Sequence, residues 1–150
     1  MTIHFYSQSA TYREFSNFAP FPIALDGEHW PTSEHYYQAQ KFTDRDLQAK
    51  IRKAEKPIIA KELADKHRDR IRPDWDAIKD GVMYRAVRRK FELHASLREL
   101  LLATGDAPII EAAPNDYYWG EGREGTGQNK LGQIIARIRA ELRAGQSDPE

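Results

Sequence analysis

The chain has 150 residues, 40% of them hydrophobic and 11% aromatic, which is the size of one ordinary domain with enough apolar side chain to form a core. Its 23 lysines and arginines balance 23 aspartates and glutamates, so no net charge attracts the whole molecule to DNA or to an anionic membrane. The absence of cysteine excludes disulfides, thiolate zinc sites and a cysteine nucleophile.

Histidine spacing and hydropathy bear on cofactors and location. The five histidines, at positions 4, 29, 35, 67 and 94, show neither the H-x-x-x-H nor the H-E-x-x-H spacing of a metal site on a helix. We therefore expect no metal and no other cofactor. No run approaches the roughly 18 apolar residues that a spanning helix needs, and the N-terminus lacks the basic and apolar regions of a signal peptide. We expect a cytoplasmic protein that does not contact membranes.

The first elements along the chain are predicted as strands. Residues 3–6 read as a short strand and residues 22–30 as a β-hairpin. Asp26 and Gly27 favour the hairpin, because they can supply the two positive-φ residues that a two-residue turn requires.

A helix should begin after Pro31 and run to about residue 42. Thr32 or Ser33 can cap the backbone N–H groups of its first turn. Glu34 falls in that turn, where the helix dipole favours a carboxylate. This placement alone would explain a glutamate on the surface.

Helices dominate the rest of the chain, with expected ranges of about 44–53, 57–65, 74–94, 96–105 and 131–142. Asp44 should cap the first of these helices, and Pro57 should open the second. Ser96 and Glu99 match a capping box for the fourth helix, which Gly105 should end.

The last helix has a regular apolar face, at offsets 0, 3, 4, 7 and 11, made of Leu131, Ile134, Ile135, Ile138 and Leu142. Before it, residues 109–111 and 117–119 are expected as strands and residues 120–132 as a glycine-rich loop. These elements predict a mainly helical α+β fold with a small antiparallel sheet. We expect one domain over residues 1–150, with a core of about 4–142 and a frayed tail over 144–150.

A polar stripe interrupts the pattern of the helix after Pro31. Glu34, Tyr37, Gln38 and Lys41 follow offsets 0, 3, 4 and 7 and so share one helix face. Such a stripe is usually solvated, but this helix is surrounded by aromatic residues in the sequence, among them Trp30. In an aromatic cleft the glutamate and the lysine would be desolvated. That environment shifts their pKa values toward the range of acid–base or amine chemistry.

A second irregular segment places a small polar pair between two aromatic residues. Phe15, Ser16, Asn17 and Phe18 follow neither a helix nor a strand period. The segment can be a turn in which Asn17 bonds its own backbone, or a loop that presents Asn17 to a ligand. The residues alone do not choose between the two.

The segment 115–132 contains five of the nine glycines of the chain. It can be a surface loop, or it can cradle a phosphate, because it enters a helix whose first N–H groups have no partner within the helix, with Arg123 and Lys130 close by. It matches neither of the usual glycine-rich nucleotide motifs. Trp119 and Asp116 could stack on a flat ring and hydrogen-bond to it, although core packing explains a tryptophan more often.

Together these segments resemble the NADAR family, also called the YbiA-like family. The motifs that carry the likeness are Phe15-Ser-Asn-Phe18, Trp30-Pro-Thr-Ser-Glu-His-Tyr-Tyr-Gln-Ala-Gln-Lys-Phe42, Lys90-Phe91, Asp116-Tyr-Tyr-Trp-Gly120 and Gly127-Gln-Asn-Lys-Leu-Gly132. The likeness runs from about residue 4 to residue 142. It implies a mainly helical fold and N-glycosidase activity without a metal. Two substrate classes are attached to the family: ribosylamino-pyrimidine phosphates of riboflavin synthesis, and ADP-ribose linked to guanine bases.

The resemblance also implies the residues of the site. Glu34 and Lys41 would be the reactive, catalytic pair. The residues expected to line the pocket and bind substrate are Asn17, Phe18, Trp30, Tyr37, Gln38, Asp116, Trp119, Gly120, Gly127 and Asn129. The expected partner is a small phosphorylated ribosyl-amine or an ADP-ribosyl-guanine, with nucleic acid a partner only in the second case.

The chemistry of the two substrate classes has a common feature. In each, ribose C1 is bonded to an exocyclic amino nitrogen that carries hydrogen, so the sugar can open to an imine. A neutral Lys41 could exchange with that imine through a Schiff base, while Glu34 protonates the ring oxygen and later activates water. The alternative is direct displacement at C1 with Glu34 and Asp116 as the acid and the base.

Three functions remain open from the sequence. The first is an N-glycosidase that disposes of reactive riboflavin precursors, and the second is an enzyme that removes ADP-ribose from guanine. Zero net charge disfavours a duplex DNA substrate, because phosphate neutralisation supplies most nonspecific affinity. The third is a module that binds ADP-ribose or a nucleotide without turnover. The Glu34 and Lys41 pair argues for an enzyme, since a binding module has no use for a nucleophile beside an acid.

Overall fold

The computed structural model describes residues 1–145 of the chain. The described chain divides into two compact units. The terminal unit combines Met1–Ala19 with the chain from Phe91 onward, and the central unit is Pro20–Lys90. The expectation of one domain stays a prediction.

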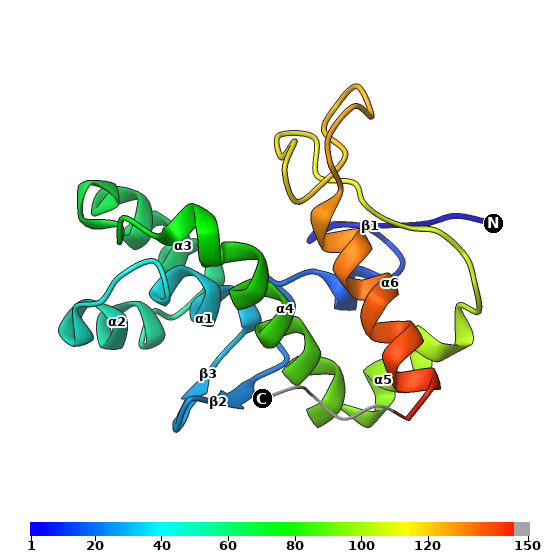
Figure 1. Cartoon of the computed structure of the whole chain (residues 1–150), viewed down its shortest axis with the longest axis horizontal. Helices are drawn as coiled ribbons and strands as arrows, with labels where there is room; N and C mark the ends of the chain where they lie inside the picture. The colour runs from blue at the N-terminus through cyan, green and yellow to red at the C-terminus, as the bar shows by residue number, and fades with distance from the viewer. Residues whose placement is uncertain (146–150) are drawn as a thin grey trace. The chain divides into compact units, whose positions relative to one another are not determined.

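The central unit holds a hairpin followed by helices (Figure 1). Its elements are β2 (Ile23–Leu25), β3 (Glu28–Trp30), α1 (Ser33–Ala39), α2 (Arg45–Arg52), α3 (Pro57–Lys66), the short 3₁₀ helix η2 (Arg68–Arg70) and α4 (Trp75–Leu93), whose last three residues belong to the terminal unit. The helix-rich fold predicted from the sequence is confirmed.

The hairpin forms as its turn residues predicted. Asp26 and Gly27 have φ angles of 55° and 79°, and Ile23 pairs antiparallel with Trp30. The Tyr36 hydroxyl donates to Asp26 Oδ2 at 2.6 Å. Arg85 of α4 donates to both groups, at 3.2 Å to the hydroxyl and 2.8 Å to Asp26 Oδ1. These bonds fasten the turn to α1 and α4.

The helix after Pro31 is shorter than predicted. Thr32 caps α1 by accepting a hydrogen bond from the His35 N–H at 3.2 Å, but the helix ends at Ala39 and not near residue 42. The last turn tightens, since the Lys41 N–H donates to the Gln38 carbonyl three residues back. Phe42, only 1% exposed, then turns into the core.

Small residues let α1 approach its neighbours within the central unit. Helix α1 packs against α2 and α3, and the α3 positions that are buried are Ala60 and Ala64. Asp44 caps α2 as predicted, accepting from the N–H groups of Asp46 and Leu47 at 2.9 and 3.2 Å. The core of the unit consists of Ile23, Trp30, Tyr36, Ala39, Phe42, Leu47, Ile51, Ala60, Ala64 and Ala86.

The terminal unit contains β1 (Ile3–Phe5), the 3₁₀ helix η1 (Arg13–Phe15), α5 (Ala95–Ala103), β4 (Ile109–Glu111) and α6 (Lys130–Arg143). Strand β1 pairs with β4 in parallel, with Ile3 opposite Ile109. Helix α6 packs on β4, and Figure 1 shows it beside β1. In the core of the unit, Phe15 meets the rings of Phe5 and Phe91 edge-on, with centroids 5.8 and 5.6 Å away.

Two local predictions for the terminal unit are wrong. Residues 117–119 form no strand, because Asp116 Oδ1 accepts the N–H groups of both Tyr118 and Trp119 and so folds the chain into a turn. Ser96 is not a cap, since α5 begins one residue earlier, at Ala95. Helix α6 ends at Arg143. The predicted tail reaches residues 146–150, which lie outside the described residues.

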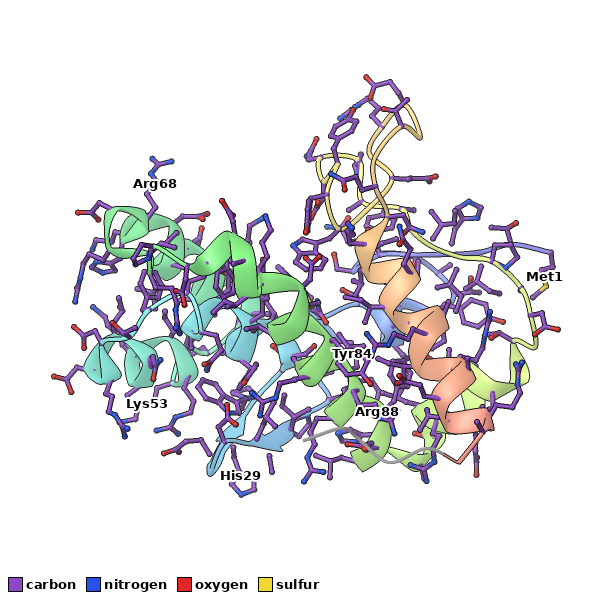
Figure 2. The ribbon with its side chains drawn as sticks, in the orientation of Figure 1. Met1, His29, Lys53, Arg68, Tyr84 and Arg88 are labelled. Atoms are coloured by element: carbon purple, nitrogen blue, oxygen red, sulfur yellow. The ribbon has the colours of Figure 1, made fainter. Side chains whose placement is uncertain are left out.

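Side chains in Figure 2 mark the outside and the inside of the central unit. Arg68 and Lys53 are exposed and extend away from the helices, whereas Tyr84 and Arg88 of α4 are buried, at 7% and 1% exposure. Within the described chain, none of the helices combines the length and the apolar character needed to cross a bilayer.

Candidate active site

Helix α1 is buried on every side. All seven of its residues are buried, including Glu34 at 6% exposure and Gln38 at 3%. The polar stripe predicted from the sequence is therefore not a solvated face. Burial of charged and amide groups is costly unless they are hydrogen-bonded, so the partners of this stripe decide what it can do.

His35 illustrates a buried polar group with a purely structural role. Its Nδ1 lies 2.8 Å from the Thr32 hydroxyl and its Nε2 lies 3.0 Å from the Ala54 carbonyl. A carbonyl can only accept, so Nε2 carries the hydrogen and Nδ1 accepts from the hydroxyl. Burial lowers the pKa of His35, partly offset by the Ala54 carbonyl, and the neutral ring ties α1 to the chain after α2.

Glu34 and Gln38 form a buried pair one helical turn apart. The Gln38 Nε2 donates to Glu34 Oε2 at 2.6 Å. The other end of the amide differs, since Gln38 Oε1 is buried and has no hydrogen-bond partner within residues 1–145. A buried acceptor without a partner costs about 1–3 kcal/mol. The pair is thus held in place but not fully satisfied.

Lys41 lies in the turn that follows α1, half-buried beside aromatic rings. Its backbone is fixed, because its carbonyl accepts from the Arg72 N–H at 2.8 Å. The Nζ atom lies 5.4 Å from the centroid of the Tyr37 ring. Tyr37 in turn packs against Trp75, with centroids 5.3 Å apart and the rings inclined by 58°. The amine therefore has an apolar wall.

The surroundings of Lys41 act on its charge in both directions. Burial lowers the pKa of Lys41 and is the largest cause. The carboxylates of Glu34 and Asp65 act against it by favouring the ammonium, while the cations of Lys61 and Lys79 add to it. The net direction is downward, which increases the fraction of neutral amine at a given pH. The sequence had indicated this direction from the aromatic neighbours.

Trp30 supports the site from the core. Its ring meets Tyr36 edge-on, with centroids 5.2 Å apart at 90°, and its indole N–H donates to the Leu25 carbonyl at 3.0 Å. The residue is 4% exposed. The polar atom of Trp30 is thus engaged by the hairpin, and its contact with a substrate stays a prediction.

In the terminal unit, Asp116 and Trp119 lie in one turn. Asp116 Oδ1 accepts the Trp119 N–H at 2.8 Å, and the Trp119 ring meets the Tyr118 ring edge-on, with centroids 4.9 Å apart. Both Asp116 and Trp119 are half-buried. The turn therefore holds the indole at the start of the glycine-rich segment, as a base-stacking role would need.

Asn129, Gly120 and Gly127 make the glycine-rich segment a tightly packed structure. The Asn129 side chain pairs with β4 as a strand would, accepting from the Glu111 N–H at 2.9 Å and donating to the Ile109 carbonyl at 3.0 Å. A Cβ on Gly127 would lie 2.4 Å from the Gly120 carbonyl oxygen. The glycines are needed for close backbone approach.

The phosphate cradle predicted at the start of α6 loses its support. The N–H groups of residues 129, 130 and 131 all donate to backbone carbonyls of residues 118–120, at 3.0 Å each. The Nζ of Lys130 lies 6.0 Å from the centroid of the Tyr118 ring. These three amides are engaged within the terminal unit and are not available to a phosphate, and substrate binding by this segment stays a prediction.

Asn17 and Phe18 lie in a turn, which is the first of the two alternatives predicted for their segment. The Ser16 carbonyl accepts from the Ala19 N–H at 3.1 Å, and the Ser16 hydroxyl accepts from the Phe18 N–H at 3.1 Å. Asn17 is 6% exposed and Phe18 is half-buried. The burial of Asn17 distinguishes it from an ordinary surface turn residue.

The structure thus brings the predicted residues together in two groups, one in each unit. The central group contains Glu34, Tyr37, Gln38 and Lys41. The terminal group contains Asp116, Trp119, Gly120, Gly127 and Asn129, while Asn17 and Phe18 lie elsewhere in the terminal unit's sequence. Sequence reasoning missed the charged groups that act on Lys41, namely Lys61, Asp65 and Lys79, and the Trp75 ring that packs against Tyr37. They come from α3 and α4, and no local spacing connects them to Lys41.

Within residues 1–145, no three or more histidine, aspartate or glutamate side chains group closely enough to hold an ion.

Known proteins are similar to this chain over nearly its whole length. The model of the NADAR domain family matches residues 4–143. The N-glycosidase YbiA of Escherichia coli K12 is 47% identical over 140 residues, which cover 93% of this chain and 88% of that protein. An N-glycosidase of Nostoc punctiforme is 42% identical over 146 residues, covering 95% and 94%.

Two further similarities concern a longer protein and a solved structure. A riboflavin biosynthesis protein of Vibrio vulnificus is 42% identical over 140 residues, which cover 93% of this chain but 38% of that protein. The NMR structure of the E. coli protein YbiA has a TM-score of 0.89 and 46% identity, covering 97% of this chain and 86% of that one.

Proposed function

The chain belongs to the NADAR domain family, and from that premise we propose that it is an N-glycosidase acting on intermediates of riboflavin biosynthesis. The substrate class is a ribosylamino-pyrimidine phosphate, in which ribose C1 is bonded to an exocyclic amine. Its hydrolysis would dispose of reactive precursors. The names of the N-glycosidase and riboflavin biosynthesis relatives support this substrate class.

One observation carries the catalytic part of the proposal: a buried carboxyl group and a lysine with a lowered pKa lie along the same helix and the turn after it. Glu34 acts on the charge of Lys41, so the two groups are within electrostatic reach of each other. A module that only binds a nucleotide has no need for such a pair. An enzyme that opens a ribosyl-amine does.

The first step opens the sugar. The lone pair of the exocyclic nitrogen forms a C1=N bond, the bond from C1 to the ring oxygen breaks, and Glu34 gives its proton to that oxygen. Glu34 becomes a carboxylate and the substrate an iminium ion. Burial disfavours the charged form of a carboxyl group, and Glu34 is only 6% exposed, which supports its role as the proton donor of this step.

The second step exchanges the amine. The neutral Lys41 attacks C1, one of its protons moves to the substrate nitrogen, and the C1–N bond to the pyrimidine breaks. The aminopyrimidine leaves with its electron pair, and the sugar stays on Lys41 as a protonated Schiff base. Burial lowers the pKa of Lys41 and so favours the neutral amine that this attack requires.

The third step returns the enzyme to its starting state. Glu34, now a carboxylate, takes a proton from water as the oxygen adds to C1. The resulting carbinolamine collapses to the free sugar aldehyde as its hydroxyl proton passes to the lysine nitrogen. Glu34 ends protonated and Lys41 ends neutral, so atoms and charges balance over the cycle.

Direct displacement at C1, with Glu34 and Asp116 as the acid and the base, is the competing mechanism. Asp116 is engaged in holding its turn, since one carboxylate oxygen accepts two backbone N–H groups. That role favours a structural aspartate. We therefore favour the Lys41 route.

Base release tests the proposed function. The protein is incubated separately with a ribosylamino-pyrimidine phosphate and with guanine-linked ADP-ribose, and the released base is followed by chromatography. We expect release from the pyrimidine substrate and its loss in Glu34→Gln. Release from the guanine substrate alone would reassign the substrate, and binding of either compound without release would identify a binding module. The cytoplasmic location and the lack of a membrane or nucleic-acid partner are proposed together with this substrate.

A further inference from the structure

The Gln38 amide is connected to the site at one end only. Its Nε2 donates to Glu34 Oε2 at 2.6 Å, whereas its Oε1 is buried and has no hydrogen-bond partner within residues 1–145. The side chain is 3% exposed, so solvent does not satisfy the carbonyl either. Buried amide oxygens in proteins are normally hydrogen-bonded. The unmatched oxygen of Gln38 therefore calls for a role.

The chemistry of Glu34 supplies that role. A carboxylate can only accept hydrogen bonds, whereas a protonated carboxyl group carries one O–H donor. The N–H end of the amide fits the carboxylate, and the carbonyl end fits the acid. Rotation of the terminal amide by about 180° exchanges its two ends at nearly the same position.

We propose that Gln38 is a positioning residue that serves Glu34 in both of its protonation states. When Glu34 is a carboxylate, Gln38 Nε2 donates to it, which is the arrangement in the structure. When Glu34 is protonated, the amide turns over and Oε1 accepts the Glu34 O–H. The unpartnered oxygen in the structure is thus the atom that bonds to Glu34 when Glu34 is protonated. This inference rests on the proposed function, in which Glu34 gives up a proton and later recovers it.

The charges around the pair come from three elements. Lys41 follows α1, Lys61 and Asp65 belong to α3, and Lys79 belongs to α4. The acidic group Asp65 and the basic groups Lys61 and Lys79 all act on Lys41, as Glu34 does. An uncharged amide can change its orientation among these groups without adding another charge. A lysine or a glutamate at position 38 would add a charge to this group.

The test compares two glutamines of the central unit. Gln38→Met keeps the length of the side chain and removes both hydrogen-bonding ends. The control is Gln48→Met, because Gln48 donates to the Phe42 carbonyl at 2.6 Å and bonds no titratable group in doing so. For each variant, kcat/KM is measured against pH with a ribosylamino-pyrimidine phosphate, and folding is checked by near-ultraviolet circular dichroism.

The two variants should differ in the shape of the pH profile. Gln38→Met should lower kcat/KM by about tenfold to a hundredfold and move the alkaline limb of the profile toward higher pH, because the carboxylate loses its donor and the first step needs Glu34 protonated. Gln48→Met should leave the shape unchanged. A profile for Gln38→Met that keeps the wild-type shape at a uniformly lower level would overturn the proposal.

A second measurement does not depend on activity. In protein labelled with ¹⁵N-glutamine, the side-chain signals of Gln38, assigned from their absence in Gln38→Met, are followed through a pH titration. They should shift with pH in the wild type and stay constant in Glu34→Gln. Constant signals in the wild type would refute the amide reversal, even if the enzyme is active. If instead the signals titrate while no base is released from either substrate, the proposed function fails and the amide reversal stands.

Discussion

Two regions were predicted to hold functional groups: α1 with the turn after it, and the glycine-rich segment of the terminal unit. They differ in how many of their buried polar atoms have hydrogen-bond partners. In the segment, the amides at the start of α6 and the Asn129 side chain all bond to backbone. On α1, Gln38 keeps an unmatched oxygen, and burial lowers the pKa of Lys41. Satisfied groups build the fold, whereas incompletely satisfied groups remain available for chemistry.

The largest effect expected from this comparison is on turnover at Glu34. Glu34→Gln keeps the size of the side chain but removes its proton donor and later base, so kcat should fall about 10²- to 10⁴-fold. Single-turnover base release measures the loss. A matched control is Glu62→Gln on the exposed surface of α3, which should retain normal turnover. An active Glu34→Gln would remove the distinction between the two regions.

Gly127→Ala should act on stability rather than on a phosphate. Its Cβ would lie 2.4 Å from the Gly120 carbonyl oxygen, which is backbone and cannot swing aside, so we expect a loss of about 3 kcal/mol. Gly81→Ala is the control, because nothing lies within 4 Å of its added Cβ. Denaturant unfolding measures both. Activity should fall equally for phosphorylated and dephosphorylated substrates. A selective loss of activity on the phosphorylated substrate would instead support a phosphate-binding role for this segment.

Asn129→Gly should give a somewhat smaller loss of stability. The glycine keeps the backbone angle, φ 51°, without strain, so the variant isolates the two bonds from the side chain to β4. We expect the free energy of unfolding to fall by about 2 kcal/mol. If turnover per folded molecule drops instead while stability is unchanged, Asn129 belongs to the chemistry and not to the scaffold.

The smallest effect concerns pH and His35. Burial holds the pKa of His35 below its ordinary value of 6.5, so the unfolded chain binds a proton more readily than the folded one. The contribution of His35 to the free energy of unfolding should therefore be fully present above about pH 6.5 and decline as the pH falls below it. Unfolding at pH 7.5 and pH 5.5 measures this, and His35→Gln should lose the part of the decline that His35 causes. An equal decline in that variant would assign it to other groups.

Elements with local signals were predictable from the sequence. The hairpin followed from Asp26 and Gly27, and α2 followed from its Asp44 cap, because each depends on neighbours within a few residues. The parallel pairing of Ile3 with Ile109 was not predicted, since no local pattern connects positions so far apart. Part of the candidate site was visible as the stripe of Glu34 and Lys41.

The remainder of the site depends on tertiary packing. Trp75 reaches Tyr37 only because the start of α4 lies beside the turn after α1, where the Arg72 N–H meets the Lys41 carbonyl. The packing of the glycine-rich segment was not predictable for a related reason. Whether the first amides of α6 have partners depends on how residues 118–120 fold back, and composition carries no information on that.

The central claim is that Lys41 carries the sugar during turnover, and borohydride trapping tests it most directly. Borohydride is added while the protein hydrolyses a ribosylamino-pyrimidine phosphate, and the reduced adduct is located by peptide mass spectrometry. We expect the mass of the sugar phosphate on Lys41, and none in Lys41→Arg, which should be inactive because arginine forms no Schiff base near neutral pH. The control is Lys53→Arg, because Lys53 is an exposed lysine at the end of α2. This variant should form the borohydride-reduced adduct at Lys41 as the wild type does. Normal turnover in Lys41→Arg with no trapped adduct in the wild type would contradict the account and favour direct displacement with Glu34 and Asp116.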